Sequence, residues 1–225
     1  MKDLLAKKAL EFVRDGYVIG LGSGSTAKAF IEALGRLASE AGLKLTLVAT
    51  SVDSELKAAE VGLGHMLRPL WLVDSIDLAV DGADEVAKDR VFLKGRGGAL
   101  VREKIVDYRA STLLILAEAT KLVPAVPARN PVPIEVVPYA WRHVARDVER
   151  KFGGVCRLRI SDSGRLGPHI TDNGNYIIDW TPPGPLGPEI EDALKGIPGV
   201  VDTGIFAKRR DAVVLLADER GVYAL

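Results

Sequence analysis

Three glycine-containing segments combine residue types that could bind and transform an anionic substrate. The first is Gly20-Leu21-Gly22-Ser23-Gly24-Ser25-Thr26, between a predicted strand and a predicted helix. Small residues let the backbone approach a ligand, N–H groups at a helix start attract an anion, and hydroxyls donate to phosphate oxygens. The segment lacks the lysine of a Walker A loop and the third glycine of a dinucleotide fingerprint. It is therefore either a phosphate-binding loop or a tight turn with Ser as helix N-cap.

The second segment is acidic and reads Asp81-Gly82-Ala83-Asp84-Glu85, directly after a predicted strand at 76–80. Ligands of open α/β sheets bind beyond the carboxyl ends of the strands. Carboxylates there could orient sugar hydroxyls, transfer protons or bind Mg²⁺, and the alternative is a solvated turn. No histidine lies nearby in the sequence, and one loop rarely supplies a full metal shell. We therefore expect no metal.

The third segment, Lys94-Gly95-Arg96-Gly97-Gly98, is a glycine-rich turn that opens a predicted helix, with Glu103 about one turn into it. A lysine could stabilise an anion and a glutamate could transfer a proton. Taken alone, Glu103 is better explained as an acid favoured by the helix dipole or as a surface partner of the neighbours of Asp107, and Lys94 as a surface residue.

Other reactive side chains are isolated in the sequence. Cys156 lies in a predicted strand and is expected to be a small packing residue. His65, His143 and His169 are far apart and show no metal-ligand spacing. We expect none of the four to take part in chemistry.

The elements that would position the three segments alternate between apolar strands and amphipathic helices over the first 120 residues. Strands are predicted at 17–21, 43–49, 76–80, 91–93 and 113–117, and helices at 4–14, 25–37, 54–61 and 99–109. Continuous apolar strands separated by helices are typical of a parallel sheet covered on both faces. The prediction is an α/β fold with a doubly wound, mostly parallel, Rossmann-like sheet.

A cluster of prolines between 124 and 138 indicates a boundary. Beyond it the predicted order is strand 132–137, helix 139–151, strands 155–160 and 175–180, helix 188–195 and strand 199–206. A hairpin turn at 172–174 separates the middle strands. This order is that of a ferredoxin-like α+β unit, and strands 212–217 and 221–225 are expected to return to the first sheet. The predicted domains are 1–127 plus 205–225, and 128–204.

Composition narrows the class of protein. The 225 residues carry 30 basic and 30 acidic side chains, so the net charge of zero argues against nonspecific nucleic-acid binding. One cysteine excludes an internal disulfide framework. No apolar run approaches the roughly 20 residues of a membrane span, and the N-terminus lacks a signal-peptide core. We expect a soluble cytoplasmic protein that binds neither nucleic acid nor membrane.

Together, the three segments resemble the type A ribose-5-phosphate isomerase family. The resemblance continues through residues 117–121, 132–138, 171–177 and 198–206, so it covers nearly the whole chain. It departs at Glu118, where the family commonly has Asp, and at Arg96, where it often has Gly. We expect the Arg96 side chain to point to solvent.

The resemblance implies interconversion of D-ribose 5-phosphate and D-ribulose 5-phosphate through a cis-enediolate, in the non-oxidative pentose phosphate pathway, without a cofactor or metal. It implies that Glu103 is the base, that Asp81 and Asp84 are active-site carboxylates and that Lys94 is the active-site lysine. It implies a homodimer or homotetramer. The substrate contacts that we expect are Ser23, Gly24, Ser25, Thr26, Gly82, Ala83, Gly95, Arg96, Gly97 and Lys121.

Three other functions compete with this interpretation. A sugar-phosphate-sensing domain of a transcriptional regulator would need a DNA-binding module, for which the sequence shows no basic patch. A CoA-transferase-like enzyme would use Glu103 as a covalent nucleophile and leave Lys94 unexplained. A dinucleotide oxidoreductase has only Asp53, after the second predicted strand, in its favour.

Overall fold

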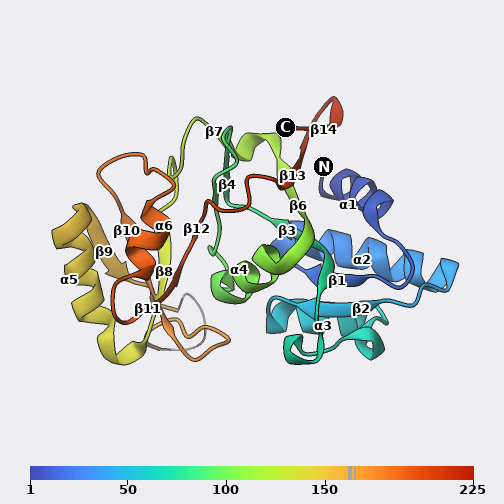
Figure 1. Cartoon of the computed structure of the whole chain (residues 1–225), viewed down its shortest axis with the longest axis horizontal. Coiled ribbons are helices and arrows are strands. Elements are labelled where there is room, and N and C mark those ends of the chain that lie inside the picture. The colour runs from blue at the N-terminus through green and yellow to red at the C-terminus, as the bar shows by residue number, and fades with distance from the viewer. Residues whose placement is uncertain (162–163, 165) are drawn as a thin grey trace. The chain divides into compact units, whose positions relative to one another are not determined.

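The computed structural model describes residues 1–161, 164 and 166–225, which form two compact units (Figure 1). The first unit comprises Met1–Ala83, Arg102–Leu122 and Asp211–Leu225, and the second comprises Asp84–Val101 and Val123–Arg210. The domain boundaries expected at 127 and 205 stay a prediction, because compact contact units need not coincide with independently folding domains.

The first unit is built on a six-stranded sheet with the order β14-β13-β6-β3-β1-β2. All neighbours pair in parallel except β14, which pairs antiparallel with β13. This confirms the mostly parallel sheet and the return of the last two strands. The order reverses between β1 and β3, and such a switch point is where open α/β sheets bind ligands. The strands are β1 Val18–Leu21, β2 Thr46–Ala49, β3 Ile76–Gly82, β6 Ala110–Glu118, β13 Val213–Asp218 and β14 Gly221–Ala224.

The helices of the first unit bury one apolar face. In α2 (Gly24–Ala41), Phe30, Ile31 and Leu34 enter a core shared with the sheet, and Gly42 ends the helix in the left-handed conformation at φ +65°. The others are α1 Lys2–Ala9, α3 Val52–Glu60 and α4 Leu100–Arg109, which begins in the second unit. Short 3₁₀ segments of the first unit are η1 Leu10–Phe12, η2 Gly64–Met66, η3 Leu70–Leu72 and η4 Ala119–Lys121, and the second unit has η5 Pro138–Ala140. None of the helices described is long and apolar enough to cross a membrane.

The second unit contains the predicted ferredoxin-like arrangement. Its four-stranded antiparallel sheet has the order β11-β8-β10-β9. Two helices lie in the crossover connections, and their apolar faces share a core with the sheet around the buried Trp180. The elements are β8 Val132–Val136, α5 Trp141–Phe152, β9 Val155–Leu158, β10 Tyr176–Thr181, α6 Ile190–Lys195 and β11 Val200–Thr203.

A third sheet, of order β12-β5-β4-β7, corrects two sequence predictions. Residues 91–93 were expected in the parallel sheet, but β5 (Phe92–Leu93) pairs antiparallel with β4 (Glu85–Ala87) and β12 (Ile205–Phe206). The strand expected at 199–206 divides at Gly204, whose N–H donates to Pro133 while its carbonyl accepts from the Lys94 amide. The chain therefore passes there from one sheet to the other. The fourth strand is β7 Leu122–Val123.

The turn predicted at 172–174 exists, but it does not join two adjacent strand ends. The Gly174 amide donates to the Thr171 carbonyl at 2.9 Å, and Gly174 has φ +78°. This turn leads directly into β10, whereas the whole connection from β9 spans residues 159–175.

Candidate active site

In the first unit, the ends of β1 and β3 meet in a tight backbone arrangement around Asp81. The side chain of Asp81 is fully buried, and its Oδ1 accepts from the amides of Ser23 at 3.1 Å and Gly82 at 2.6 Å. A Cβ on Gly22 would lie 2.2 Å from Asp81 Cγ, so only glycine permits this approach. The glycine-rich loop and the acidic segment are thus parts of one local structure.

The Ser23 hydroxyl is held in a cluster of buried hydroxyls that sequence reasoning missed. Ser23 Oγ lies 2.8 Å from Thr50 Oγ1 and 2.7 Å from Ser51 Oγ, and Ser54 Oγ donates to the Gly22 carbonyl at 2.6 Å. Ser23 occupies the N-cap position of α2, but its side chain makes no capping hydrogen bond. A serine is therefore at the N-cap position, as predicted, but its hydroxyl bonds to the neighbouring hydroxyls and does not cap the helix.

The residues of the predicted loop at the start of α2 differ in their exposure to solvent. Gly24 has φ +85° and, like Ser25, is exposed, while Thr26 is buried. The first amides of a helix have no partner within the helix. The loop therefore has both the backbone and the hydroxyl donors that a phosphate needs.

Two further predicted residues of the first unit are charged. The Nζ of Lys121, which is half-buried, donates to the Ala83 carbonyl at 2.5 Å. Glu103 lies in the first turn of α4, as the helix-dipole interpretation expected, but it is only 6% exposed and is therefore not a surface residue. One turn later, Asp107 is also buried, a residue that the sequence analysis did not single out.

In the second unit, Asp84 and the glycine-rich turn are joined by hydrogen bonds. The Asp84 amide donates to the Leu93 carbonyl at 2.8 Å, and Asp84 Oδ2 accepts from the Arg96 amide at 3.0 Å. Positive φ angles fall on Gly95 (+97°) and Gly98 (+84°), which explains why arginine is tolerated between them. The Arg96 side chain is exposed, as expected.

Lys94 is not the surface lysine that its sequence position alone suggested. It is 2% exposed, and its ammonium lies 5.3 Å from the centre of the Phe206 ring. A cation over an aromatic face is electrostatically favoured. A buried ammonium of this kind could stabilise negative charge on a substrate.

A hollow of about 500 Å³ within the second unit includes Asp84 and Arg96 in its lining. Arg159 and Asp179 also line this hollow, and they form an ion pair that the sequence did not predict, with 2.5 Å between Arg159 Nη2 and Asp179 Oδ1. Nothing in the local sequence distinguishes Arg159, directly after β9, or Asp179, on β10, from ordinary surface charges.

Glu85 belongs to the scaffold rather than to the acidic site. Its buried carboxylate accepts from the amides of Ala128, Arg129 and Asn130 at 2.6–2.8 Å, and from Asn130 Nδ2 at 2.8 Å. The third carboxylate of the acidic segment therefore fixes the proline-rich stretch.

The cysteine and the three histidines that are isolated in the sequence differ in burial. Burial, followed by the charge of Glu149, raises the pKa of the Cys156 thiol to about 12. His65 and His143 are exposed and His169 is half-buried. Within the described ranges, no group of His, Cys, Asp or Glu is arranged to hold a metal ion.

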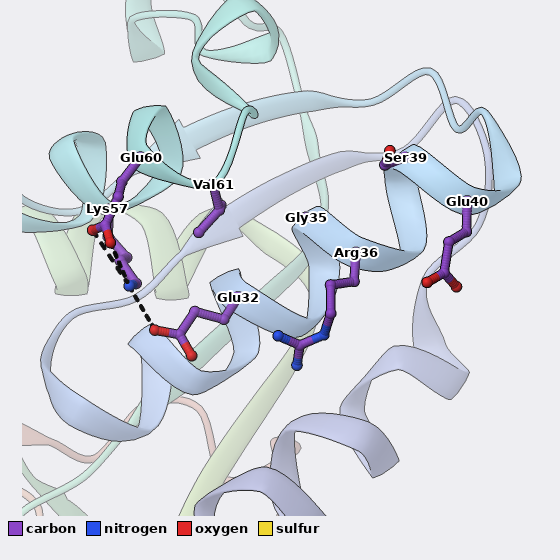
Figure 2. Close-up of a pocket in the computed structure, with 8 residues that line it drawn as sticks. All are labelled: Glu32, Gly35, Arg36, Ser39, Glu40, Lys57, Glu60 and Val61. Carbon is purple, nitrogen blue, oxygen red and sulfur yellow. Dashed lines mark hydrogen bonds and ion pairs between the residues drawn. The ribbon is translucent and has the colours of Figure 1, made fainter.

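A separate hollow of about 540 Å³ lies between α2 and α3 and contains none of the predicted site residues (Figure 2). Lys57 forms ion pairs there with Glu32 and Glu60 at 2.5 and 3.3 Å. The hydrogen bond to Glu32 raises the pKa of Lys57 and lowers that of the glutamate. This hollow is a charged, solvated surface.

The predicted site residues divide between the two units. The first unit holds Ser23–Thr26, Asp81–Ala83, Glu103 and Lys121, and the second holds Asp84 and Lys94–Gly97. The contacts of these residues given above each join residues of the same unit.

Comparison with known proteins identifies the family. The family model of ribose 5-phosphate isomerase A (phosphoriboisomerase A) matches residues 46–221. Ribose-5-phosphate isomerase A of Thermococcus kodakarensis is 45% identical, over 99% of this chain and 96% of the relative. The solved ribose 5-phosphate isomerase A of Methanocaldococcus jannaschii is 39% identical with a TM-score of 0.92, covering 100% of this chain and 97% of that one. A D-ribose-5-phosphate isomerase solved with phospho-erythronic acid is 42% identical with a TM-score of 0.94, covering 100% of this chain and 96% of that one. The chain belongs to the ribose 5-phosphate isomerase A family.

Proposed function

We propose that this chain interconverts D-ribose 5-phosphate and D-ribulose 5-phosphate, with Glu103 carrying the proton between C2 and C1. The observation that supports these roles most is that Asp81, Lys94 and Glu103 are all buried. Charged side chains are almost never buried without a partner or a function. Relatives that match over the whole chain carry the isomerase name, which favours this reaction over a sensor, a CoA-transferase or an oxidoreductase.

The reaction requires a base, because a C–H next to a carbonyl is a weak acid. Glu103 takes the C2 proton of the open-chain aldose, which leaves a cis-enediolate, and returns the proton to C1. Removing water from around a carboxylate makes it a better proton acceptor. The burial of Glu103 is suited to that step.

Negative charge then develops on the substrate oxygens and must be stabilised. Lys94 supplies fixed positive charge to the oxyanion. Asp81 and Asp84 accept hydroxyl protons, which opens the furanose ring and moves the proton between O1 and O2. Hydrogen bonds from the backbone amides of Ser23 and Arg96 fix the orientation of the Asp81 and Asp84 carboxylates, respectively.

The phosphate is remote from the reacting carbons and serves to anchor the substrate. The start of α2, with Ser23–Thr26, provides amides and hydroxyls, and Lys121 provides an ammonium. Binding energy gained there positions C1 and C2 for proton transfer. The predicted homodimer or homotetramer and the cytoplasmic location remain parts of this proposal.

The proposal is tested by incubating the protein with ribose 5-phosphate in deuterated water and following the products by NMR. We expect ribulose 5-phosphate with deuterium on C1, because the enediolate exchanges its proton with solvent through Glu103. Failure to form the ketose would refute the function. A ketose that carries the original C2 hydrogen on C1 and no deuterium would contradict this exchange with solvent through Glu103.

A further inference from the structure

Arg159 connects the ferredoxin-like sheet to the glycine-rich turn within the second unit. The residue directly follows β9, and its Nη1 donates to the carbonyls of Gly95 at 3.2 Å and Arg96 at 3.0 Å. Its Nε and Nη2 donate to the two carboxylate oxygens of Asp179 on β10, at 2.9 and 2.5 Å. One guanidinium thus joins two carbonyls of the turn to a carboxylate of the sheet.

These contacts determine the direction in which the amides of the turn point. Both peptide bonds that follow Gly95 and Arg96 are trans, so each N–H points opposite to the carbonyl of the same peptide. The Gly95 carbonyl faces Arg159, and the Arg96 amide of that peptide donates to Asp84. By the same geometry, the Arg96 carbonyl at Arg159 directs the Gly97 amide away from the guanidinium.

Gly97 is accessible to a ligand. It is exposed, and a Cβ built on it would meet no atom within 4 Å. A backbone amide that is held in place at an exposed position is a suitable donor to a substrate oxygen.

The chemistry of the contact requires arginine. A planar guanidinium can hold a carboxylate with two donors and still direct a third at carbonyl oxygens, whereas an ammonium acts as a point charge. The side chains of Arg159 and Asp179 are 17% and 21% exposed. Partial burial keeps the pair less screened than a surface ion pair and restricts the guanidinium to one orientation.

We propose that Arg159, held by Asp179, is a positioning residue that fixes the turn after Lys94 and presents the Gly97 amide to the substrate. The inference rests on the proposed function, because it assumes that this turn contacts a sugar phosphate. Arg159 itself touches no reacting atom in this account.

The test measures binding of phospho-erythronic acid by calorimetry, together with isomerisation kinetics. The variants are Arg159→Gln, Arg159→Lys and Asp179→Asn. The matched control is Arg150→Gln, because Arg150 pairs with Asp147 through the same atom types at 2.7 Å but is 81% exposed. The stoichiometry of binding reports the folded fraction, and the dissociation constant reports the geometry of the turn.

We expect Arg159→Gln and Arg159→Lys to raise the dissociation constant about tenfold, the scale of one lost hydrogen bond, with kcat/KM falling at least as much. Asp179→Asn should raise the dissociation constant by a smaller factor. Arg150→Gln should have the same dissociation constant and kcat/KM as the unmodified chain. A purely structural role would lower the stoichiometry and leave the dissociation constant unchanged.

The inference is overturned if folded Arg159→Gln and Arg159→Lys bind and turn over like Arg150→Gln. If Arg159→Gln does not fold, the inference is overturned when folded Arg159→Lys and Asp179→Asn bind the ligand and turn over like Arg150→Gln. An unmodified chain that neither binds the ligand nor isomerises ribose 5-phosphate would refute the proposed function, and this inference with it.

Discussion

Replacing Glu85 tests whether the acidic segment contains a scaffold residue beside its proposed active-site carboxylates. The carboxylate of Glu85 is almost completely buried and accepts four hydrogen bonds from residues 128–130. Glu85→Ala removes all four acceptor contacts. Glu85→Gln keeps one oxygen but turns an N–H₂ group toward the Ala128 amide, so that donor faces donor.

The magnitude follows from those contacts. A hydrogen bond to a charged group contributes about 1.5–3 kcal/mol to stability. Ala128 and Arg129 are exposed, so water can replace part of what Glu85→Ala removes. We therefore expect Glu85→Ala to lower the free energy of unfolding by about 3–5 kcal/mol, the range for breaking a buried charged contact. Glu85→Gln, which loses one bond and the charge, should cost about 2 kcal/mol.

The assay is urea denaturation followed by tryptophan fluorescence, to which Trp180, buried in the second unit, contributes together with Trp71 and Trp141. The control is Glu219→Gln, because that glutamate is exposed. Folded Glu85→Gln should also keep kcat/KM within about threefold of the unmodified chain, since Glu85 has no role in the proposed reaction. The reasoning is refuted if Glu85→Ala is as stable as the control, or if folded Glu85→Gln loses turnover.

Three more perturbations follow from the site and its surroundings. Lys121→Ala should raise KM about 10- to 100-fold and lower kcat less, because the ammonium that lies at Ala83 is proposed to hold the phosphate; a pure kcat effect in steady-state kinetics would contradict that role. Gly22→Ala should abolish activity and lower Tm, because the new Cβ would lie 2.2 Å from Asp81 Cγ; an active variant with unchanged Tm would contradict the close approach. Cys156 should resist alkylation at pH 8, where a pKa of about 12 leaves roughly one thiolate in 10⁴; native alkylation as fast as in urea would show the thiol to be accessible and ionised.

The two larger sheets could be predicted from the sequence because their elements are long enough to show a period. Continuous apolar strands such as residues 113–117 indicated the parallel sheet, and the element order beyond residue 131 indicated the ferredoxin-like one. The third sheet could not be predicted in the same way. Its strands span two or three residues each, too few for any periodicity, and Gly204 gives no sign in the sequence that the chain changes sheets there.

The site was predictable by residue type but not by environment. A sequence motif can identify Lys94 and Glu103 as candidates. Their burial depends on tertiary packing, which the residues next to them in the sequence do not determine. Glu85 looked equivalent to Asp84 and Asp81, and only its contacts with residues 128–130 separate it from them. Arg159 carries no motif at all, because its role depends on a register across β9 and β10.

The central claim, that Glu103 moves the proton, is tested most directly by the turnover of Glu103→Gln compared with Glu219→Gln. The amide keeps the shape of the side chain but cannot accept the proton. We expect kcat to fall by at least about 10³-fold, within the range attributed to a positioned general base, while the variant still binds phospho-erythronic acid with unchanged stoichiometry. Near-normal turnover of folded Glu103→Gln would contradict the account.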